Sequence, residues 1–234
     1  MIELAVFDMA GTTIDDGGAV YRALESAVAS TGATVDPGDL QTWMGTDKVQ
    51  AITALLELGG VAPTDELVTA TFARFKSELA EAYRATPPFA FDGVPEAIAI
   101  LRSRGIRVAL TTGFDRDVTD GLLASLGWTV AQDPAGEISD TVTLDAVVTT
   151  SDVRAGRPAP YMIHHAMELT GVHDVRAVLA AGDTLVDLEA ARNAGAVAVG
   201  VLTGALSREA LERGPSDHIV DGVAVVPDLA ETRG

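Results

Sequence analysis

The sequence LAVFDMAGTT (residues 4–13) decides the fold, because an apolar, strand-like segment at Leu4–Phe7 runs directly into a carboxylate and a glycine turn. The carboxylate is Asp8, and two threonines follow the glycine. A carboxylate in this position is typical of a nucleophile on a tight turn, at the edge of an α/β sheet where ligands bind. We therefore expect Asp8 to end a buried strand and to face a ligand.

From Phe91 onward, apolar segments alternate with helical segments. We expect strands over residues 107–111, 146–149, 177–181, 196–201 and 218–220. Helices are expected between them over residues 95–104, 118–126, 161–170 and 185–194, and a glycine follows each one. This alternation, with strands that are almost entirely apolar, indicates an α/β fold with a Rossmann-like parallel sheet covered by helices on both faces.

Residues 16–89 show helical patterns and no convincing strand. Two helices are expected near residues 20–28 and 49–56, and a longer one follows Pro63, where Thr64 can cap the free amides. The long helix carries an apolar stripe: Val68, Phe72, Phe75, Leu79 and Ala82. We expect an all-helical cap over residues 16–89, inserted into a Rossmann-like α/β core of residues 1–15 and 90–234, where it can close over the carboxyl edge of the sheet.

The charge balance limits the classes of partner. The chain has 16 basic and 34 acidic residues, and its net charge of -18 disfavours binding to nucleic acid or to an anionic membrane. It has no cysteine, so disulfides and thiolate chemistry are excluded. The first strand begins close to Met1, and no apolar run reaches about 18 residues, so we expect a cytoplasmic protein.

Polar residues follow several of the expected strands, at the edge where such sheets bind ligands. Asp8 and Asp183 can hold Mg²⁺ through carboxylate oxygens, and Asp187, one turn into the next helix, can ligate or orient the metal. Thr112 can donate to a phosphoryl oxygen, and Arg157 can neutralise its charge. Taken singly, these residues are more often helix caps, turn formers or surface charges. Their shared place at strand ends favours a site.

In these motifs the chain resembles the haloacid dehalogenase superfamily of aspartate-nucleophile hydrolases, across essentially its full length. The resemblance is carried by Asp8–Thr13, Thr112, Arg157 and Gly182–Asp187. It is sharper for the phosphonoacetaldehyde hydrolase (phosphonatase) branch, whose pattern is similar to residues 8–13, 111–113, 155–160, 166–169 and 192–195.

The resemblance implies a role for each matching residue. Asp8 would attack phosphorus and form an aspartyl-phosphate. Mg²⁺ would be held by Asp8, the backbone carbonyl of Ala10, Asp183 and Asp187. The resemblance also implies that the substrate or its phosphoryl group is contacted by a further set of residues: Thr12, Gly113, Met44 and Gly45.

Ala10 bears on the choice of reaction. Phosphatases of the superfamily have an aspartate two residues after the nucleophile, which protonates the leaving alkoxide, and this chain has Ala10 there. Cleavage of a C–P bond instead requires that the departing carbanion be stabilised, which a lysine Schiff base can do. Lys48 stands three residues after Met44-Gly45, where the phosphonatase lysine is found. The alternative is a solvated lysine in the first turn of a helix.

Three positions depart from the branch: Ala51 replaces a histidine, Gly18 a cysteine and Phe114 a tyrosine. These changes concern the substrate pocket and proton handling, and they would fit a phosphonatase-like relative that acts on a different organophosphonate or phosphate. The reaction that the resemblance implies is hydrolysis of the C–P bond of phosphonoacetaldehyde or a related carbonyl organophosphonate. The missing acid has four substitutes in principle, each of which is more typical of a cap, hinge or turn: Asp15, Asp16, Asp47 and Asp115.

Two other functions remain open at this point. One is a phosphatase that acts on a small phosphate monoester, and the other is a low-turnover protein that binds phosphorylated metabolites. Family members often pair through the cap, so a homodimer is an option, with an exposed Trp43 or the Phe72/Phe75 stripe as the contact surface.

Overall fold

The computed structural model describes residues 1–131 and 143–231, and the chain forms two compact units. The core unit comprises Met1–Asp15 and Phe89–Gly234, and the cap unit comprises Asp16–Pro88. Phe89 falls in the core unit because it pairs with Asp15 in a short antiparallel ladder between β2 (Ile14–Asp15) and β3 (Phe89–Ala90). Both connections to the cap unit therefore leave the core unit from this ladder.

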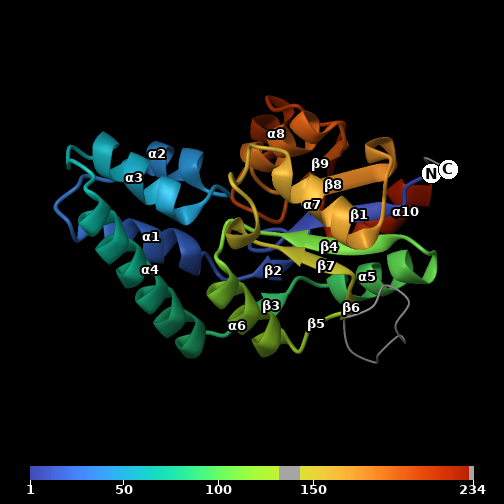
Figure 1. Cartoon of the computed structure of the whole chain (residues 1–234), viewed down its shortest axis with the longest axis horizontal. Coiled ribbons are helices and arrows are strands. Elements are labelled where there is room, and N and C mark those ends of the chain that lie inside the picture. The colour runs from blue at the N-terminus through green and yellow to red at the C-terminus, as the bar shows by residue number, and fades with distance from the viewer. Residues whose placement is uncertain (132–142, 232–234) are drawn as a thin grey trace. The chain divides into compact units, whose positions relative to one another are not determined.

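The core unit is built on a six-stranded sheet in the order β10-β9-β8-β1-β4-β7, and every neighbouring pair is parallel (Figure 1). Its strands are β1 (Leu4–Asp8), β4 (Arg107–Thr111), β7 (Ala146–Val148), β8 (Val178–Gly182), β9 (Val197–Val201) and β10 (His218–Val220). A further parallel pair joins β5 (Thr129–Val130) to β6 (Thr143–Leu144). The expected α/β fold class with a parallel sheet is confirmed.

Helices cover both faces of this sheet. They are α5 (Val94–Ser103), α6 (Arg116–Leu126), α7 (Tyr161–Thr170), α8 (Leu185–Ala194), α9 (Arg208–Glu212) and α10 (Val226–Glu231). Residues of α7 and α8 share one apolar cluster with Leu4 and Val6 of β1. Alternate residues of a strand point to opposite faces, so Ala5 and Phe7 face the other side, where α5 lies (Figure 1).

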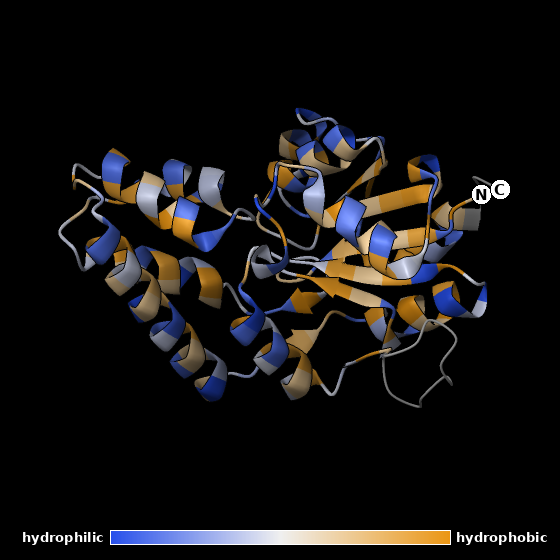
Figure 2. Ribbon diagram, in the orientation of Figure 1, coloured by the Kyte–Doolittle hydropathy of each residue, from blue (hydrophilic) through white to orange (hydrophobic). Residues whose placement is uncertain are grey.

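Burial of both faces explains why the strands are so apolar (Figure 2). All five residues of β1 are buried, and so are all five of β8 and of β9. A side chain of the size of Phe7 contributes about 1.5–3 kcal/mol when it is removed from water. The sheet therefore gives the carboxyl ends of β1 and β8 a rigid base.

The cap unit is all-helical in the residues 16–88 that form it. Its helices are α1 (Ala19–Ala29), α2 (Pro37–Trp43), α3 (Lys48–Leu58) and α4 (Asp65–Ala85). The side chain of Thr64 accepts a hydrogen bond from the Leu67 amide, as expected for the cap of α4. The short helix α2 was not expected, although Asp36 caps it and Pro37 stands in its first turn.

Several element ends differ from expectation by one or two residues, and local capping explains two of them. The strand expected over 146–149 ends at Val148, because Thr149 instead caps the 3₁₀ turn Thr150–Asp152. The helix expected from residue 118 begins at Arg116, because the side chain of Asp115 accepts from the Val118 amide. None of the helices within residues 1–131 and 143–231 is both long and apolar enough to cross a membrane.

Candidate active site

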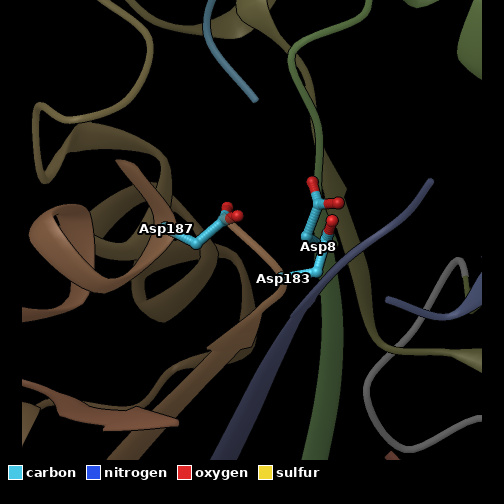
Figure 3. A group of neighbouring side chains, drawn as sticks. All are labelled: Asp8, Asp183 and Asp187. Atoms are coloured by element: carbon cyan, nitrogen blue, oxygen red, sulfur yellow. The ribbon is translucent and has the colours of Figure 1, made fainter. Parts of the chain in front are cut away.

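Three buried carboxylates meet at the carboxyl edge of the sheet. Asp8 ends β1, Asp183 follows β8, and β1 and β8 are neighbours in the sheet. Figure 3 shows the side chain of Asp187 reaching from the first turn of α8 toward the other two. One oxygen of each residue lies within 4.8 Å of the others. Oxygen donors at this spacing suit a hard divalent cation such as Mg²⁺, so these residues fit a metal ion.

Arg157 ties two of these carboxylates together. Its Nη2 lies 2.6 Å from Oδ1 of Asp8, and its Nη1 contacts Oδ1 of Asp187. The other oxygen of Asp187 accepts from the backbone amide and the hydroxyl of Thr184, so both oxygens of Asp187 already have partners in the chain. Arg157 is 4% exposed; its Nε has no hydrogen-bond acceptor among the residues described, and its Nη2 is charge-paired with Asp8 without making a hydrogen bond.

The turn after Asp8 is closed by its own backbone and hydroxyls. The amides of Thr12, Thr13 and Ile14 all donate to the carbonyl oxygen of Met9. Gly11 has φ +90°, a conformation that favours glycine, and a Cβ there would lie 2.6 Å from Oδ2 of Asp183. Thr12 donates its hydroxyl hydrogen to Oδ1 of Asp183 at 2.9 Å. The turn therefore links the strand that ends in Asp8 to the carboxylate of the neighbouring strand.

The negative charges of these buried carboxylates are only partly balanced by the positive charge of Arg157. Burial, followed by the negative charge of Asp8, raises the pKa of Asp183 from 3.8 to about 7. The hydrogen bond from Thr12 and the charge of Arg157 oppose this rise without cancelling it. One arginine among three buried aspartates leaves excess negative charge, which a divalent cation would neutralise.

This raised pKa predicts that stabilisation by Mg²⁺ grows with pH. In the metal-free protein the Asp183 carboxyl keeps its proton up to about pH 7, whereas the unfolded chain loses it near 3.8. Its contribution to stability is therefore present at low pH and is lost as the pH rises through 7. We expect Mg²⁺ to raise the melting temperature more at pH 8 than at pH 6, as calorimetry of the full chain would show. An equal rise at both values would contradict the raised pKa.

Thr112 and Gly113 lie beside these carboxylates in the same unit. Thr111 of β4 pairs with Asp8 of β1, so Thr112 comes directly after the strand next to the one that Asp8 ends. Thr112 is 3% exposed, and its hydroxyl oxygen accepts from the Phe114 amide at 3.2 Å. The sheet register thus brings the ends of β1, β4 and β8 to one edge, together with the residues that follow them.

In the cap unit, Lys48 begins α3 and is 4% exposed. Its ammonium group donates to the carbonyl oxygen of Thr46 at 3.1 Å. Lys48 therefore stands in the first turn of a helix, as the alternative had it, but its side chain is buried and not solvated. The preceding loop is compact: Met44 is buried, Gly45 has φ +79°, and the Thr46 hydroxyl donates to the carbonyl of Trp43 at 2.7 Å. Ala51, at the position of the expected histidine, is fully buried on α3.

Three of the four carboxylates that were alternatives for the missing acid accept hydrogen bonds at the starts of helices. Asp47 accepts from the Gln50 amide and caps α3, and Asp115 caps α6. Asp16 accepts from the amides of Gly18 and Val20, at the start of α1. The hydroxyl of Tyr83 also donates to Asp16, and burial together with this carboxylate raises the pKa of Tyr83. Asp15 lies in β2.

The residues expected to offer a surface for pairing are less accessible than the sequence suggested. Phe75 is fully buried and stacks against the half-buried Phe72 at a centroid distance of 6.2 Å. Lys76 lies over the Phe72 ring at 5.1 Å. Trp43 is half-buried, not exposed. The Phe72/Phe75 stripe therefore packs within this chain. Pairing through the cap stays a prediction.

Two residues near the carboxylates were missed by the sequence reasoning. Thr203 follows β9, and its hydroxyl donates to the carbonyl oxygen of Gly11 at 2.6 Å. A Cβ on the next residue, Gly204, would lie 1.9 Å from Oδ2 of Asp183. A signal was present in the sequence, because Thr203 follows a buried strand, as does Thr112, which was identified by its place at a strand end.

Comparison with known proteins agrees with this geometry. A family model described as haloacid dehalogenase-like hydrolase matches residues 2–195. The chain belongs to the haloacid dehalogenase-like hydrolases. Phosphonoacetaldehyde hydrolase of Bacillus cereus is 32% identical to it over 245 aligned residues, which cover 96% of this chain and 86% of the relative. The expected branch of the family is therefore confirmed, and the protein is a hydrolase.

Solved structures show the same fold. A hydrolase from Pseudomonas syringae superposes with a TM-score of 0.82 at 21% identity, over 98% of each chain. A phosphonoacetaldehyde hydrolase-like protein from Oleispira antarctica has a TM-score of 0.77 at 23% identity, over 99% of this chain and 93% of that one. In this haloacid dehalogenase-like hydrolase, then, the buried aspartates occupy the carboxyl edge of the sheet.

Proposed function

We propose that this hydrolase cleaves the C–P bond of phosphonoacetaldehyde, or of a related carbonyl organophosphonate, with the help of Mg²⁺. The observation that carries the proposal is the buried amine of Lys48 in a chain that has Ala10 in place of the phosphatase acid. The named function of the Bacillus cereus relative supports the same substrate class. A phosphatase would need an acid for its leaving group.

Asp8 is the proposed nucleophile. Its carboxylate ends a rigid strand and lies beside Arg157, so it is held in one orientation for attack on phosphorus. The Nε donor of Arg157, which has no hydrogen-bond acceptor among the described residues, supports binding of the phosphoryl oxygens, together with Thr112, Thr12 and Gly113. Mg²⁺, held by Asp8, Asp183 and the Ala10 carbonyl, would neutralise the negative charge of the phosphoryl group.

The proposed role of Asp187 is to orient. Both of its oxygens have partners, Thr184 and Arg157, so it holds the guanidinium in place and adds negative charge next to the metal site. Of the residues expected to hold the metal, Asp187 is therefore the one whose contacts least favour direct ligation.

Lys48 is proposed to form an imine with the substrate carbonyl, releasing water. When Asp8 bonds to phosphorus and the C–P bond breaks, the electron pair moves into the protonated imine and gives an enamine. Proton transfer to carbon and addition of water then release the aldehyde and restore the amine, and a second water frees phosphate from Asp8. Met44 and Gly45 are proposed to line the substrate beside this lysine.

A phosphate-release screen tests the proposal. The full chain with Mg²⁺ is offered organophosphonates and small phosphate monoesters, with Asp8→Ala as the blank. We expect phosphate and an aldehyde to appear together from phosphonoacetaldehyde or a carbonyl analogue. Turnover of monoesters alone would identify a phosphatase instead. Binding of phosphate or phosphonate with no release would identify the low-turnover binding protein.

A further inference from the structure

The loop after β9 reaches the nucleophile turn. Thr203, two residues after the end of the strand, donates its hydroxyl hydrogen to the carbonyl oxygen of Gly11 at 2.6 Å. Gly11 belongs to the turn that begins at Asp8, and its φ of +90° leaves this peptide in a conformation that favours glycine. The bond therefore anchors the turn from outside its own segment.

The order of the strands explains where this bond lies. In the sheet, β8 stands between β9 and β1. A bond from the loop after β9 to the turn after β1 must therefore pass over the carboxyl end of β8, where Asp183 stands. Thr203 thus closes the chain over the buried carboxylate that follows β8.

The backbone on both sides of this bond touches the Asp183 carboxylate. A Cβ on Gly204 would lie 1.9 Å from Oδ2, and a Cβ on Gly11 would lie 2.6 Å from the same oxygen. On the other side, Thr12 donates to Oδ1 at 2.9 Å. The carboxylate is therefore confined between two glycines and a hydroxyl, and no larger residue at either glycine leaves it in place.

We propose that Thr203 and Gly204 are positioning residues for the metal site. By fixing the Gly11 carbonyl and packing on Asp183, the loop after β9 holds the Asp8 turn and the Asp183 carboxylate at the spacing that a divalent cation requires. The inference rests on the metal site of the proposed function and is independent of the substrate. It assigns an effect on cation affinity to two residues of this loop that are not themselves proposed as metal ligands.

Titration of the metal-free full chain with Mg²⁺ at pH 8, without substrate, tests the role of Thr203. Thr203→Val keeps the shape of the side chain and removes the donor. We expect it to weaken Mg²⁺ binding by about tenfold, as is typical for the loss of an outer hydrogen bond at a metal site. Thr203→Ser, which keeps the hydroxyl, is expected to restore binding. Unchanged affinity in the valine variant, or equal loss in both variants, would overturn the proposal.

Gly204→Ala tests the packing contact, by thermal unfolding of the full chain with and without Mg²⁺ and by the same titration. The added methyl group must displace the Asp183 side chain, so we expect Mg²⁺ to lose most of its stabilising effect on thermal unfolding. Gly121→Ala is the matched control, because a Cβ at Gly121 meets nothing within 4 Å. A folded Gly204→Ala protein that binds Mg²⁺ like the parent would overturn the proposal. If Gly204→Ala does not fold, the comparison of Thr203→Val with Thr203→Ser decides whether the proposal holds.

These measurements also separate this inference from the proposed reaction. If the unaltered chain binds Mg²⁺ but turns over no phosphonate, the proposed substrate is contradicted and the positioning role is unaffected. Absence of Mg²⁺ binding by the unaltered chain would overturn the metal site and the positioning role together.

Discussion

Asp8→Asn is expected to abolish phosphate release from every substrate that the parent protein turns over. The amide has nearly the same shape as the carboxylate, but it is a poor nucleophile and cannot form the aspartyl-phosphate. Removal of a nucleophile of this kind typically lowers kcat by on the order of a thousandfold or more. Phosphate release under saturating substrate and Mg²⁺ measures the loss.

The control for this variant must show that the fold survives. Asp8 is buried beside Arg157, so the amide leaves that guanidinium without one of its charge partners, and the melting temperature of the variant should be recorded. Glu189→Gln makes the same chemical change at an exposed position on α8 and is expected to leave the rate unaltered. A folded Asp8→Asn protein with a substantial fraction of the parent rate would exclude Asp8 as the nucleophile.

Lys48→Arg is expected to abolish C–P cleavage while the metal site stays intact. The guanidinium keeps the positive charge but stays protonated, so it cannot add to a carbonyl and form an imine. We expect phosphonate turnover to fall by about a hundredfold or more, as for the loss of an activated nucleophile. Stabilisation by Mg²⁺ should be unchanged, because the aspartates all lie in the core unit.

The chain offers a matched control for this substitution, because it has only two lysines. Lys76→Arg on α4 makes the same change beside Phe72 and is expected to keep full activity. Full activity in Lys48→Arg would eliminate the imine mechanism.

Borohydride trapping separates the imine from the phosphorus step. With a carbonyl phosphonate, reduction of the imine should attach a covalent adduct to Lys48, detected by peptide mass spectrometry. In Asp8→Asn the C–P bond cannot break, so the trapped adduct should still contain phosphorus, whereas in the parent it should contain only the aldehyde fragment. An adduct on Lys76 alone, or none, would contradict the assignment.

Much of the fold was predictable from local patterns. The strands at 107–111 and 218–220 and the helices at 161–170 and 185–194 have the bounds that the sequence predicted. Their periodicity, flanking glycines and caps are properties of neighbouring residues, so no tertiary contact is needed to predict them. The helix α2 was missed because its seven residues are too few to show a clear helical periodicity, although Asp36 and Pro37 indicate where it starts.

The sequence by itself determined the α/β class and placed Asp8, Thr112 and Asp183 at strand ends, because parallel strands bring their carboxyl ends to one edge. Only the tertiary structure decided that Thr203 bonds to the turn after Asp8 and that Gly204 packs on Asp183, since both contacts depend on β8 standing between β1 and β9. It also decided that Lys48 is buried and that Arg157 bridges Asp8 and Asp187. These contacts join residues far apart in the chain, and strand order and packing set them, not local propensity.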